Sequence, residues 1–174
     1  MSVTRKLDFG TMSLMDALDL AILVEEEARD RYLEFVDQLE LNHTREAAKF
    51  FRFMAQNETR HGEEISKRRQ ALFGDRPRWV TREMLWDVEA PDYDQARTSM
   101  STRAAVLAAL ASEEKAHAFF VAAIPHVKEP EVLALFEELR DEELYHRDLV
   151  RQQLGELGPD ADEKWDTSDE PVAQ

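Results

Sequence analysis

The stretches Glu58-Thr-Arg-His61 and Glu143-Leu-Tyr-His146 repeat one pattern, a glutamate with a histidine three residues later. A further glutamate comes before each stretch, Glu25 before the first and Glu113 before the second. Glu113 follows Glu25 by 88 residues and Glu143 follows Glu58 by 85, so the two sets keep nearly the same spacing. This regularity indicates two similar helical hairpins rather than scattered acidic residues.

Each set lies within long segments that have the periodicity of helices. Apolar residues recur there at steps of three and four, the period of an α-helix. The predicted helices cover residues 13–39, 47–74, 101 or 102 to 125, and 130–158. Ser13 and either Ser101 or Thr102 suit helix starts, Gly74 suits a helix end, and Pro130 suits a first turn. The sequence therefore predicts an all-α chain with four long helices.

The connection between the second and third predicted helices is long, covering residues 75–100. Two prolines interrupt the helical pattern there, and residues 81–87 have the pattern of one short helix. Two antiparallel hairpins joined by such a crossover form the ferritin-like four-helix bundle, which we assign to one domain over residues 1–158. The acidic segment 159–174 has almost no aliphatic residues and is expected to be disordered.

Composition narrows the partners and the chemistry of the chain. Its 174 residues carry a formal net charge of −15, which disfavours nucleic acid and anionic membrane surfaces as partners. The absence of cysteine excludes disulfides, thiolate metal sites and a rubredoxin-type iron centre. We find neither a membrane span nor a secretory signal, and therefore expect a soluble cytoplasmic protein. Metal cations suit the negative charge.

Helical phase turns the repeated residues toward the centre of the predicted bundle. Glu25, Glu113 and both Glu-x-x-His pairs keep the register of the apolar positions, whereas Glu26 and Glu114 rotate away. A carboxylate in an apolar core is costly unless it is paired or binds a metal. Two helices that each give one glutamate and two that give Glu-x-x-His form the ligand set of a two-metal carboxylate site. Oxygen-rich sites with one imidazole per metal suit iron or manganese.

Spacing alone does not identify such a site. Glu40 with His43, and Glu114 with His117, have the same three-residue separation as the two repeated pairs. The first of these pairs spans a predicted turn, and the second lies outside the repeat register. The inward position of the repeated pairs is what favours a metal site over acids that form only salt bridges.

The segment Glu25-Glu-Glu-Ala-Arg-Asp-Arg-Tyr32 resembles the first-helix motif of the rubrerythrin branch of the ferritin-like superfamily, and the resemblance extends over residues 13–158. It implies a non-haem centre of two iron ions, for which manganese is an alternative. The ligands that it implies are Glu25, Glu58, His61, Glu113, Glu143 and His146. Glu58 and Glu143 are the implied bridges between the two ions.

Two features depart from the rubrerythrin pattern. Rubrerythrins commonly carry a rubredoxin domain with four cysteines, and this chain has none, so we expect electrons from an external donor or from ferrous iron. Ala116 stands one turn after Glu113, where rubrerythrins usually have a second glutamate. We therefore expect the metal beside His61 to keep its ligands in both oxidation states. We expect His117 to be a hydrogen-bond partner of the site or a satisfied buried histidine rather than a ligand.

These features together predict a di-iron protein that reacts with O2 or peroxide, with oxidoreductase or ferroxidase-type chemistry. Two alternatives remain open: an iron-handling protein without sustained turnover, and a metal-free structural bundle. Tyr32 and Tyr145 lie near the ligands in sequence, where they either pack or act as hydrogen-bond donors or electron relays. We further expect a homodimer or a higher homo-oligomer.

Overall fold

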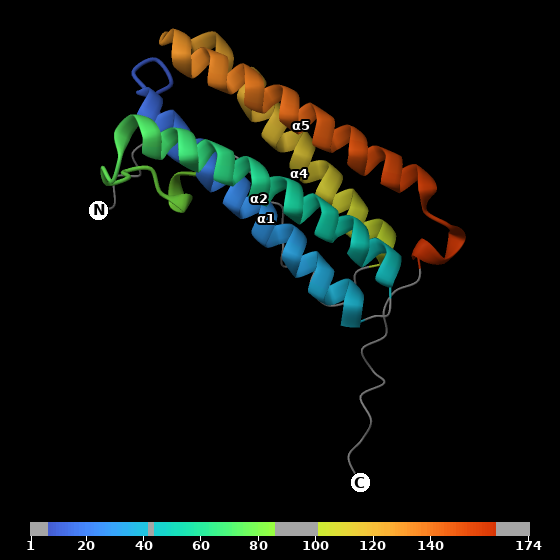
Figure 1. Ribbon diagram of the computed structural model, residues 1–174. Coiled ribbons are helices and arrows are strands. Elements are labelled where there is room, and N and C mark those ends of the chain that lie inside the picture. Colours follow the sequence, from blue (N-terminus) through green and yellow to red (C-terminus); the bar gives the residue numbers. More distant parts are fainter. Residues whose placement is uncertain (1–6, 42–43, 86–100, 163–174) are drawn as a thin grey trace, which may run out of the picture.

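The computed structural model describes residues 7–41, 44–85 and 101–162, and within these ranges it contains four long helices and no strand (Figure 1). The long helices are α1 (Leu14–Leu41), α2 (Arg45–Phe73), α4 (Thr102–Ala123) and α5 (Pro130–Glu156). The short 3-10 turns are η1 (Arg82–Leu85), η3 (Ile124–His126) and η4 (Pro159–Asp162). The prediction of an all-α chain is confirmed. None of the described helices is apolar over the length needed to cross a bilayer.

Local sequence accounts for the ends of the helices. The hydroxyl oxygens of Ser13 and Ser101 accept hydrogen bonds from backbone amides three residues later, at 3.2 and 3.1 Å. Gly74 ends α2 with a φ of 60°, a conformation that favours glycine because it has no Cβ. Pro130 lies in the first turn of α5, where its missing N–H has no partner to lose.

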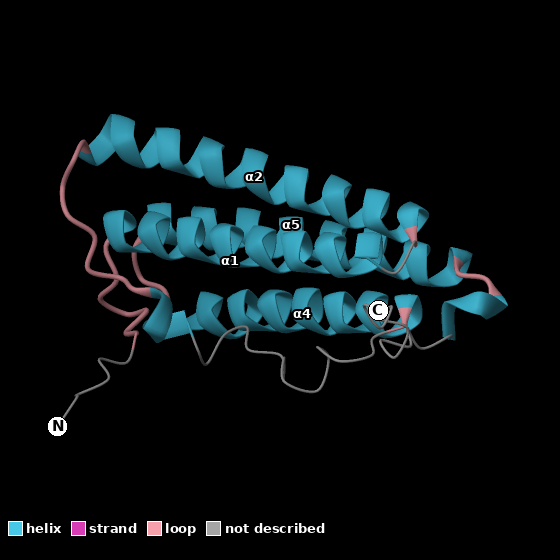
Figure 2. Cartoon of the chain, turned by 90° about the horizontal axis from the view of Figure 1, so that it is seen from below, coloured by secondary structure: helices cyan, strands magenta, loops and turns pink. Residues whose placement is uncertain are grey.

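The helices form two antiparallel hairpins, α1 with α2 and α4 with α5, which pack together as a bundle (Figure 1, Figure 2). The crossover from α2 to α4 is described as far as residue 85. The short helix predicted over residues 81–87 is the 3-10 turn η1, and its last two residues lie outside the described ranges. Leu85 is buried and Trp79 packs against the core, so the first part of the crossover covers the bundle.

The apolar core consists of two clusters, which lie at different positions along the axis of the bundle. One cluster includes Leu18, Phe120 and Phe136, and the other includes Tyr32 and Phe51. On every long helix, the glutamates and histidines of the repeated pattern fall between the residues of one cluster and those of the other. They form a polar layer enclosed by apolar residues on both sides, in which any uncompensated charge is costly.

A buried ion pair joins α1 to the end of α2. Asp19 is fully buried and accepts hydrogen bonds of 2.8 and 3.3 Å from the Arg69 guanidinium. The same guanidinium donates to the carbonyl oxygens of Gly74, at 2.5 Å, and Arg76, at 2.6 Å. Because these charge-assisted bonds use the donors on both sides of the guanidinium, the pair avoids the penalty of an uncompensated buried charge. They also fix the path of the chain where it leaves α2.

The chain continues beyond the predicted end of the bundle as the turn η4. Ala161 of this turn is buried, and Asp162 forms an ion pair of 2.7 Å with Arg103 of α4. The first four residues of the segment expected to be disordered therefore form an ordered turn against α4. Residues 163–174 lie outside the described ranges, so the expectation for them is untested.

Candidate metal centre

The six residues of the repeated pattern meet in the polar layer. They are Glu25 of α1, Glu58 and His61 of α2, Glu113 of α4, and Glu143 and His146 of α5. All are buried except His61, whose side chain is 12% exposed. Their nitrogen and oxygen atoms fall into overlapping groups, within which the atoms lie no more than 4.8 Å apart. Groups of this size and composition can hold metal ions.

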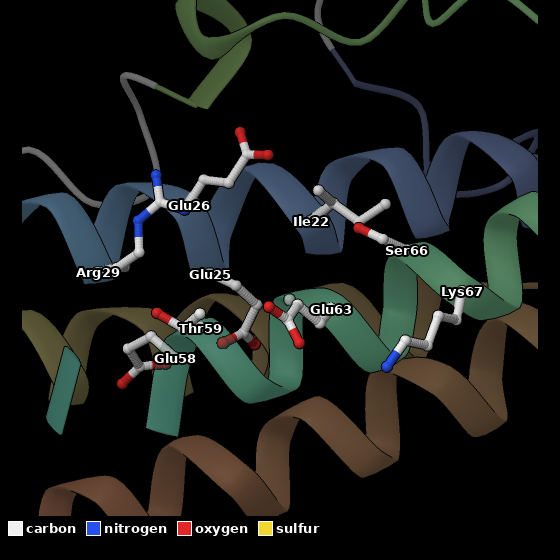
Figure 3. A pocket seen from close by; sticks show the side chains of 10 residues that line it. Ile22, Glu25, Glu26, Arg29, Glu58, Thr59, Glu63, Ser66 and Lys67 are labelled. Carbon is white, nitrogen blue, oxygen red and sulfur yellow. The ribbon is translucent and has the colours of Figure 1, made fainter. Parts of the chain in front are cut away.

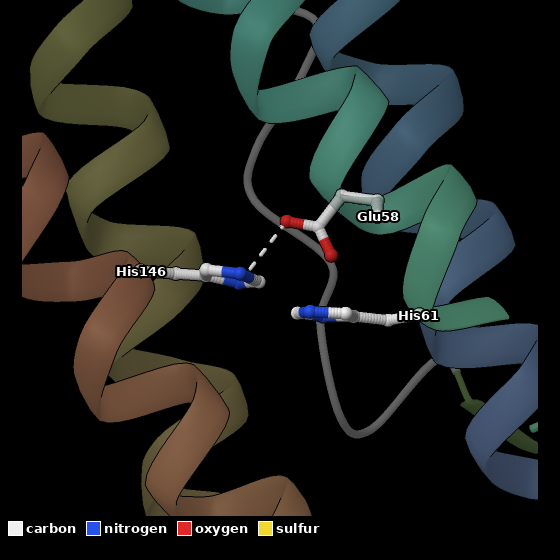
Figure 4. Close-up of side chains that lie close together, drawn as sticks. All are labelled: Glu58, His61 and His146. Atoms are coloured by element: carbon white, nitrogen blue, oxygen red, sulfur yellow. Dashed lines mark ion pairs between the residues drawn. The ribbon is translucent and has the colours of Figure 1, made fainter. Parts of the chain in front are cut away.

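Glu58 lies beside both histidines (Figure 4). One of its carboxylate oxygens is 3.1 Å from Nδ1 of His146, while the ring of His61 extends toward the same space from the next turn of α2. The two imidazole rings are nearly parallel, with centroids 5.4 Å apart and an interplanar angle of 9°. A carboxylate placed beside two imidazoles can bridge two metal ions, one next to each ring.

Glu113 and Glu143 form a second group with His146. One oxygen of Glu113 accepts a hydrogen bond from the Tyr32 hydroxyl, and the other lies 3.8 Å from Nδ1 of His146. The Tyr32 ring is fully buried and stacks on Phe51 with centroids 5.8 Å apart. Tyr32 therefore both packs in the core and orients a candidate ligand from outside the metal positions.

Burial favours the protonated form of the carboxyl groups on the second hairpin. It raises the pKa of Glu113 to about 7, although a hydrogen bond with Glu143 and the charge of Arg31 act in the opposite direction. It also raises the pKa of Glu143 well above its usual range, and the three other carboxylates of the layer raise it further. Glu143 thus lies within electrostatic reach of all three. A bound cation would offset the cost of ionising these groups.

Both histidines are favoured in the neutral form that binds metals. Burial lowers the pKa of His146 to about 4, with smaller effects of His61 and Arg60, and burial is also the main cause that lowers the pKa of His61. Within the described ranges, neither ring nitrogen of His146 makes a hydrogen bond. Nδ1 of His61 makes none there either. A buried imidazole without hydrogen bonds is costly, and coordination to a metal removes that cost. The donor set therefore fits two oxygen-preferring cations.

A pocket between α1 and α2 reaches two of the candidate ligands, Glu25 and Glu58 (Figure 3). Its volume is about 310 Å³. The rest of its lining includes Glu26, Arg29, Thr59, Glu63, Ser66 and Lys67. Gly62 also lines it, and a Cβ there would approach the Cβ of Glu25 to 3.3 Å, so the two helices pass closely beside the pocket. The pocket is large enough for O2, peroxide or a metal ion.

Tyr145 and His117, which are near the candidate ligands in the sequence, lie toward the surface. Tyr145 is 56% exposed, and its ring contacts the ring of His146 with centroids 6.0 Å apart. His117 is half-buried, and burial lowers its pKa together with the charges of Arg147 and Arg140 on α5. No candidate metal-binding group among the described residues includes His117. His117 is thus only half-buried, and the expectation that it is a hydrogen-bond partner of the site rather than a ligand stays a prediction.

Glu142 of α5 is a residue at the site that the helical pattern does not reveal. It forms a third group with Glu25 and His61, and one of its oxygens lies 3.8 Å from Nδ1 of His61. Its side chain is 29% exposed. Burial raises its pKa to about 7, and neighbouring carboxylates contribute. In the sequence Glu142 stands one residue off the inward stripe and looks like a surface acid. Only the packing of α5 against α2 shows where it lies.

The acids expected to turn away from the site belong to no candidate metal-binding group among the described residues, although Glu26 lines the pocket beside Glu25. Glu114 forms an ion pair of 2.7 Å with Arg151, and Glu26 lies 3.8 Å from Arg82. Glu40, which precedes His43 with the same spacing as the repeated pairs, forms an ion pair with Arg52, and His43 lies outside the described residues. Helical phase thus separates the buried acids from those that share only their spacing.

Comparisons with known proteins agree with this architecture. A family model described as rubrerythrin matches residues 16–154, a range that contains all six candidate ligands. The chain is also similar to an uncharacterized conserved protein from Magnetospirillum magnetotacticum MS-1, whose crystal structure aligns with a TM-score of 0.70 at 27% sequence identity. That alignment covers 84% of this chain and 97% of the other. No curated protein matches the chain.

Proposed function

Because the chain belongs to the rubrerythrin family, we propose that it is a non-haem di-iron protein whose reduced centre reacts with O2 or peroxide. The observation that supports this proposal best is the buried His146. Its Nε2 has no hydrogen-bond partner within the described ranges, and its Nδ1, although 3.1 Å from an oxygen of Glu58, is not hydrogen-bonded to it. His146 lies in a layer with four carboxyl groups. When all four are ionised, their negative charges balance the four positive charges of two divalent cations. The same donors accept manganese, so the metal has to be determined by experiment.

The geometry supports a division of the ligands between two metal positions. We assign Glu25 and His61 to one position, Glu113 and His146 to the other, and Glu58 and Glu143 to the bridges. Glu58 supports this assignment because it groups with both histidines. Glu143 supports it because it groups with Glu113 and His146, and because the charges of the three other carboxylates raise its pKa. We call the two positions the His61 end and the His146 end.

Two bound ferrous ions would supply the two electrons that, with two protons, convert one molecule of peroxide to two of water. The six candidate ligands would hold the ions and neutralise their charge, and the apolar clusters on either side of the layer exclude water. Tyr32 fixes the orientation of Glu113, and the pocket between α1 and α2 gives a small oxidant a path to Glu25 and Glu58. The chain has no cysteine for a rubredoxin-type centre, so the electrons come from an external donor or from added ferrous iron.

Iron loading and reaction with peroxide test this proposal. Metal-free protein is loaded with Fe(II) under anaerobic conditions, its iron content is measured, and the absorption spectrum is followed after peroxide is added. We expect two ions per chain and a spectral change that Glu58→Ala abolishes. Repeated turnover with an electron donor would identify a peroxide reductase, whereas continued oxidation of added Fe(II) alone would favour iron handling. A chain that binds no metal would be a structural bundle, contrary to the proposal.

A further inference from the structure

Glu142 lies on the side of α5 that faces α2. Successive residues of an α-helix point about 100° apart, so Glu142 cannot share the inward direction of its neighbour Glu143. One turn earlier on the same side, Glu138 lies 3.8 Å from Arg68 of α2. Glu142 continues this row and lies 3.8 Å from His61 of α2. Its carboxylate therefore reaches the polar layer from the boundary between the two hairpins.

The distance between Glu142 and His61 suits two ligands of one metal better than a direct contact. A hydrogen bond from nitrogen to oxygen has a length of about 2.7–3.2 Å, which is shorter than the 3.8 Å observed. Two atoms that each lie about 2.1 Å from the same ion can be separated by up to about 4.2 Å. Nδ1 of His61 makes no hydrogen bond within the described ranges, so it is available to a cation.

A third donor converges on the same point. An oxygen of Glu25, an oxygen of Glu142 and a nitrogen of His61 all lie within 4.8 Å of one another, and Glu25 is almost completely buried. The His146 end has no equivalent carboxylate at the matching position on α2, because Asn57 precedes Glu58 where Glu142 precedes Glu143. The extra donor thus belongs to one metal position only.

We propose that Glu142 is a seventh metal ligand, which completes the His61 end together with Glu25 and His61. This inference rests on the proposed function, since it requires that the polar layer binds two cations. A further carboxylate oxygen favours a hard, highly charged cation, so the His61 end binds ferric iron better than the His146 end does.

A titration with Mn(II) under anaerobic conditions tests the inference without any turnover. Wild-type protein, Glu142→Gln and the control Glu138→Gln are titrated by calorimetry, with circular dichroism to confirm the fold. Glutamine keeps the size of the side chain and removes its charge. We expect Glu142→Gln to lower the affinity for one of the two Mn(II) ions by at least about tenfold and to leave the affinity for the other unchanged. Glu138→Gln, which changes the next acid on the same row, should bind both ions as the wild type does.

The outcomes separate this inference from the proposed function. Two ions bound by Glu142→Gln with wild-type affinities would overturn the role of Glu142 and leave the di-metal proposal intact. A wild-type chain that fails to bind two ions would overturn both. A crystal structure of the Mn(II)-loaded wild type gives the direct test, since a ligating oxygen of Glu142 should lie about 2.2 Å from the ion. A separation above about 3 Å would show that Glu142 is not a ligand.

Discussion

Tyr32 follows Glu25 by seven residues on the first hairpin, and Phe120 follows Glu113 by seven on the second. Both rings are fully buried, but only Tyr32 carries a hydroxyl, and it donates that hydroxyl to Glu113 of the opposite hairpin. Phe120 has no hydroxyl and cannot donate an equivalent hydrogen bond to the first hairpin. Each hairpin thus provides the same candidate ligands, while the Tyr32 hydroxyl that orients Glu113 comes from the first hairpin alone.

The helices that carry the Glu-x-x-His pairs differ in the same way. Asn57 on α2 corresponds to Glu142 on α5, and Gly62, beside the pocket, corresponds to Arg147. The two hairpins thus share the pattern of candidate ligands but differ in the residues around it. The difference teaches that two metal positions with matching ligands need not be equivalent: the His146 end is deeply buried, and the His61 end is more accessible.

The largest expected effect comes from removing a residue that both positions share. Glu58→Ala and Glu143→Ala should each lose both metals, because each carboxylate is proposed to bridge the two ions. Elemental analysis after iron loading measures this, with Glu26→Ala and Glu114→Ala as controls that keep two ions per chain. Loss of a single ion in either bridge variant would show that the two positions are independent, and normal stoichiometry would show that the bridges are other residues.

The buried ion pair of the first hairpin gives the next largest effect. The positions that correspond to Asp19 and Arg69 on the second hairpin are Leu107 and Leu154, so this pair has no counterpart there. Asp19→Ala should lower the free energy of unfolding of the metal-free protein by about 3–5 kcal/mol, because it leaves the Arg69 guanidinium buried without its anion. Urea denaturation measures the change. Leu107→Ala, at an exposed position, should stay within about 0.5 kcal/mol of the wild type.

The raised pKa values of Glu113 and Glu143 predict that metal binding depends on pH. Metal binding must displace their protons, so affinity should rise about tenfold per pH unit between pH 5 and 7 for each proton released. Competition with a chromophoric chelator at several pH values measures this. Equal metal affinity at pH 5.5 and pH 7 would show that Glu113 and Glu143 are not protonated in the metal-free protein.

The stability of the metal-free protein should change in the opposite sense. Glu113 ionises near 4.5 when unfolded and near 7 when folded, so folding takes up protons and stability falls as pH rises through that range. The lowered pKa values of His146, His61 and His117 oppose this trend up to and through about pH 6.5, whereas the raised pKa values of Glu142 and Glu143 add to the effect of Glu113 at higher pH. Denaturation at pH 6.5 and pH 8 should therefore show the metal-free protein to be less stable at the higher pH. A rise in its stability over this range would count against the assignment.

Tyr32→Phe should produce the smallest of these effects. The substitution gives the first hairpin the phenylalanine that the second already has at Phe120, and it removes only the hydrogen bond to Glu113. Loss of such an orienting partner weakens metal binding about tenfold. We expect that loss at the His146 end alone, measured by Mn(II) titration. Tyr145→Phe, at an exposed tyrosine, is the control and should leave both affinities unchanged.

Sequence predicted the long helices well because their ends depend on neighbouring residues. The caps at Ser13 and Ser101 and the glycine at Gly74 act within one turn of the helix they limit, so the chain itself contains the information. The crossover depends on packing against the bundle. Its short helix is accordingly a 3-10 turn, Arg82–Leu85, within the part that the structure describes.

The candidate site was partly predictable for the same reason. Helical phase placed six acids and histidines in one layer, because each needed only the register of its own helix. The carboxylate of Glu142 and the hydrogen bond from Tyr32 to Glu113 depend on which surfaces of two helices meet. A single helix does not contain that information. Its pattern gave no sign of Glu142, and it named Tyr32 as a possible donor without indicating the acceptor.

The contacts of Arg69 have a mechanical consequence for the site. Its guanidinium binds α1, through Asp19, and the two carbonyl groups with which the crossover begins. Arg69 follows Glu58 by 11 residues, a distance of about 16 Å along the helix. A force exerted through the crossover therefore reaches these hydrogen bonds before it reaches the ligand layer. The start of the crossover is thus tied to α1 and α2 at a point well away from the candidate ligands.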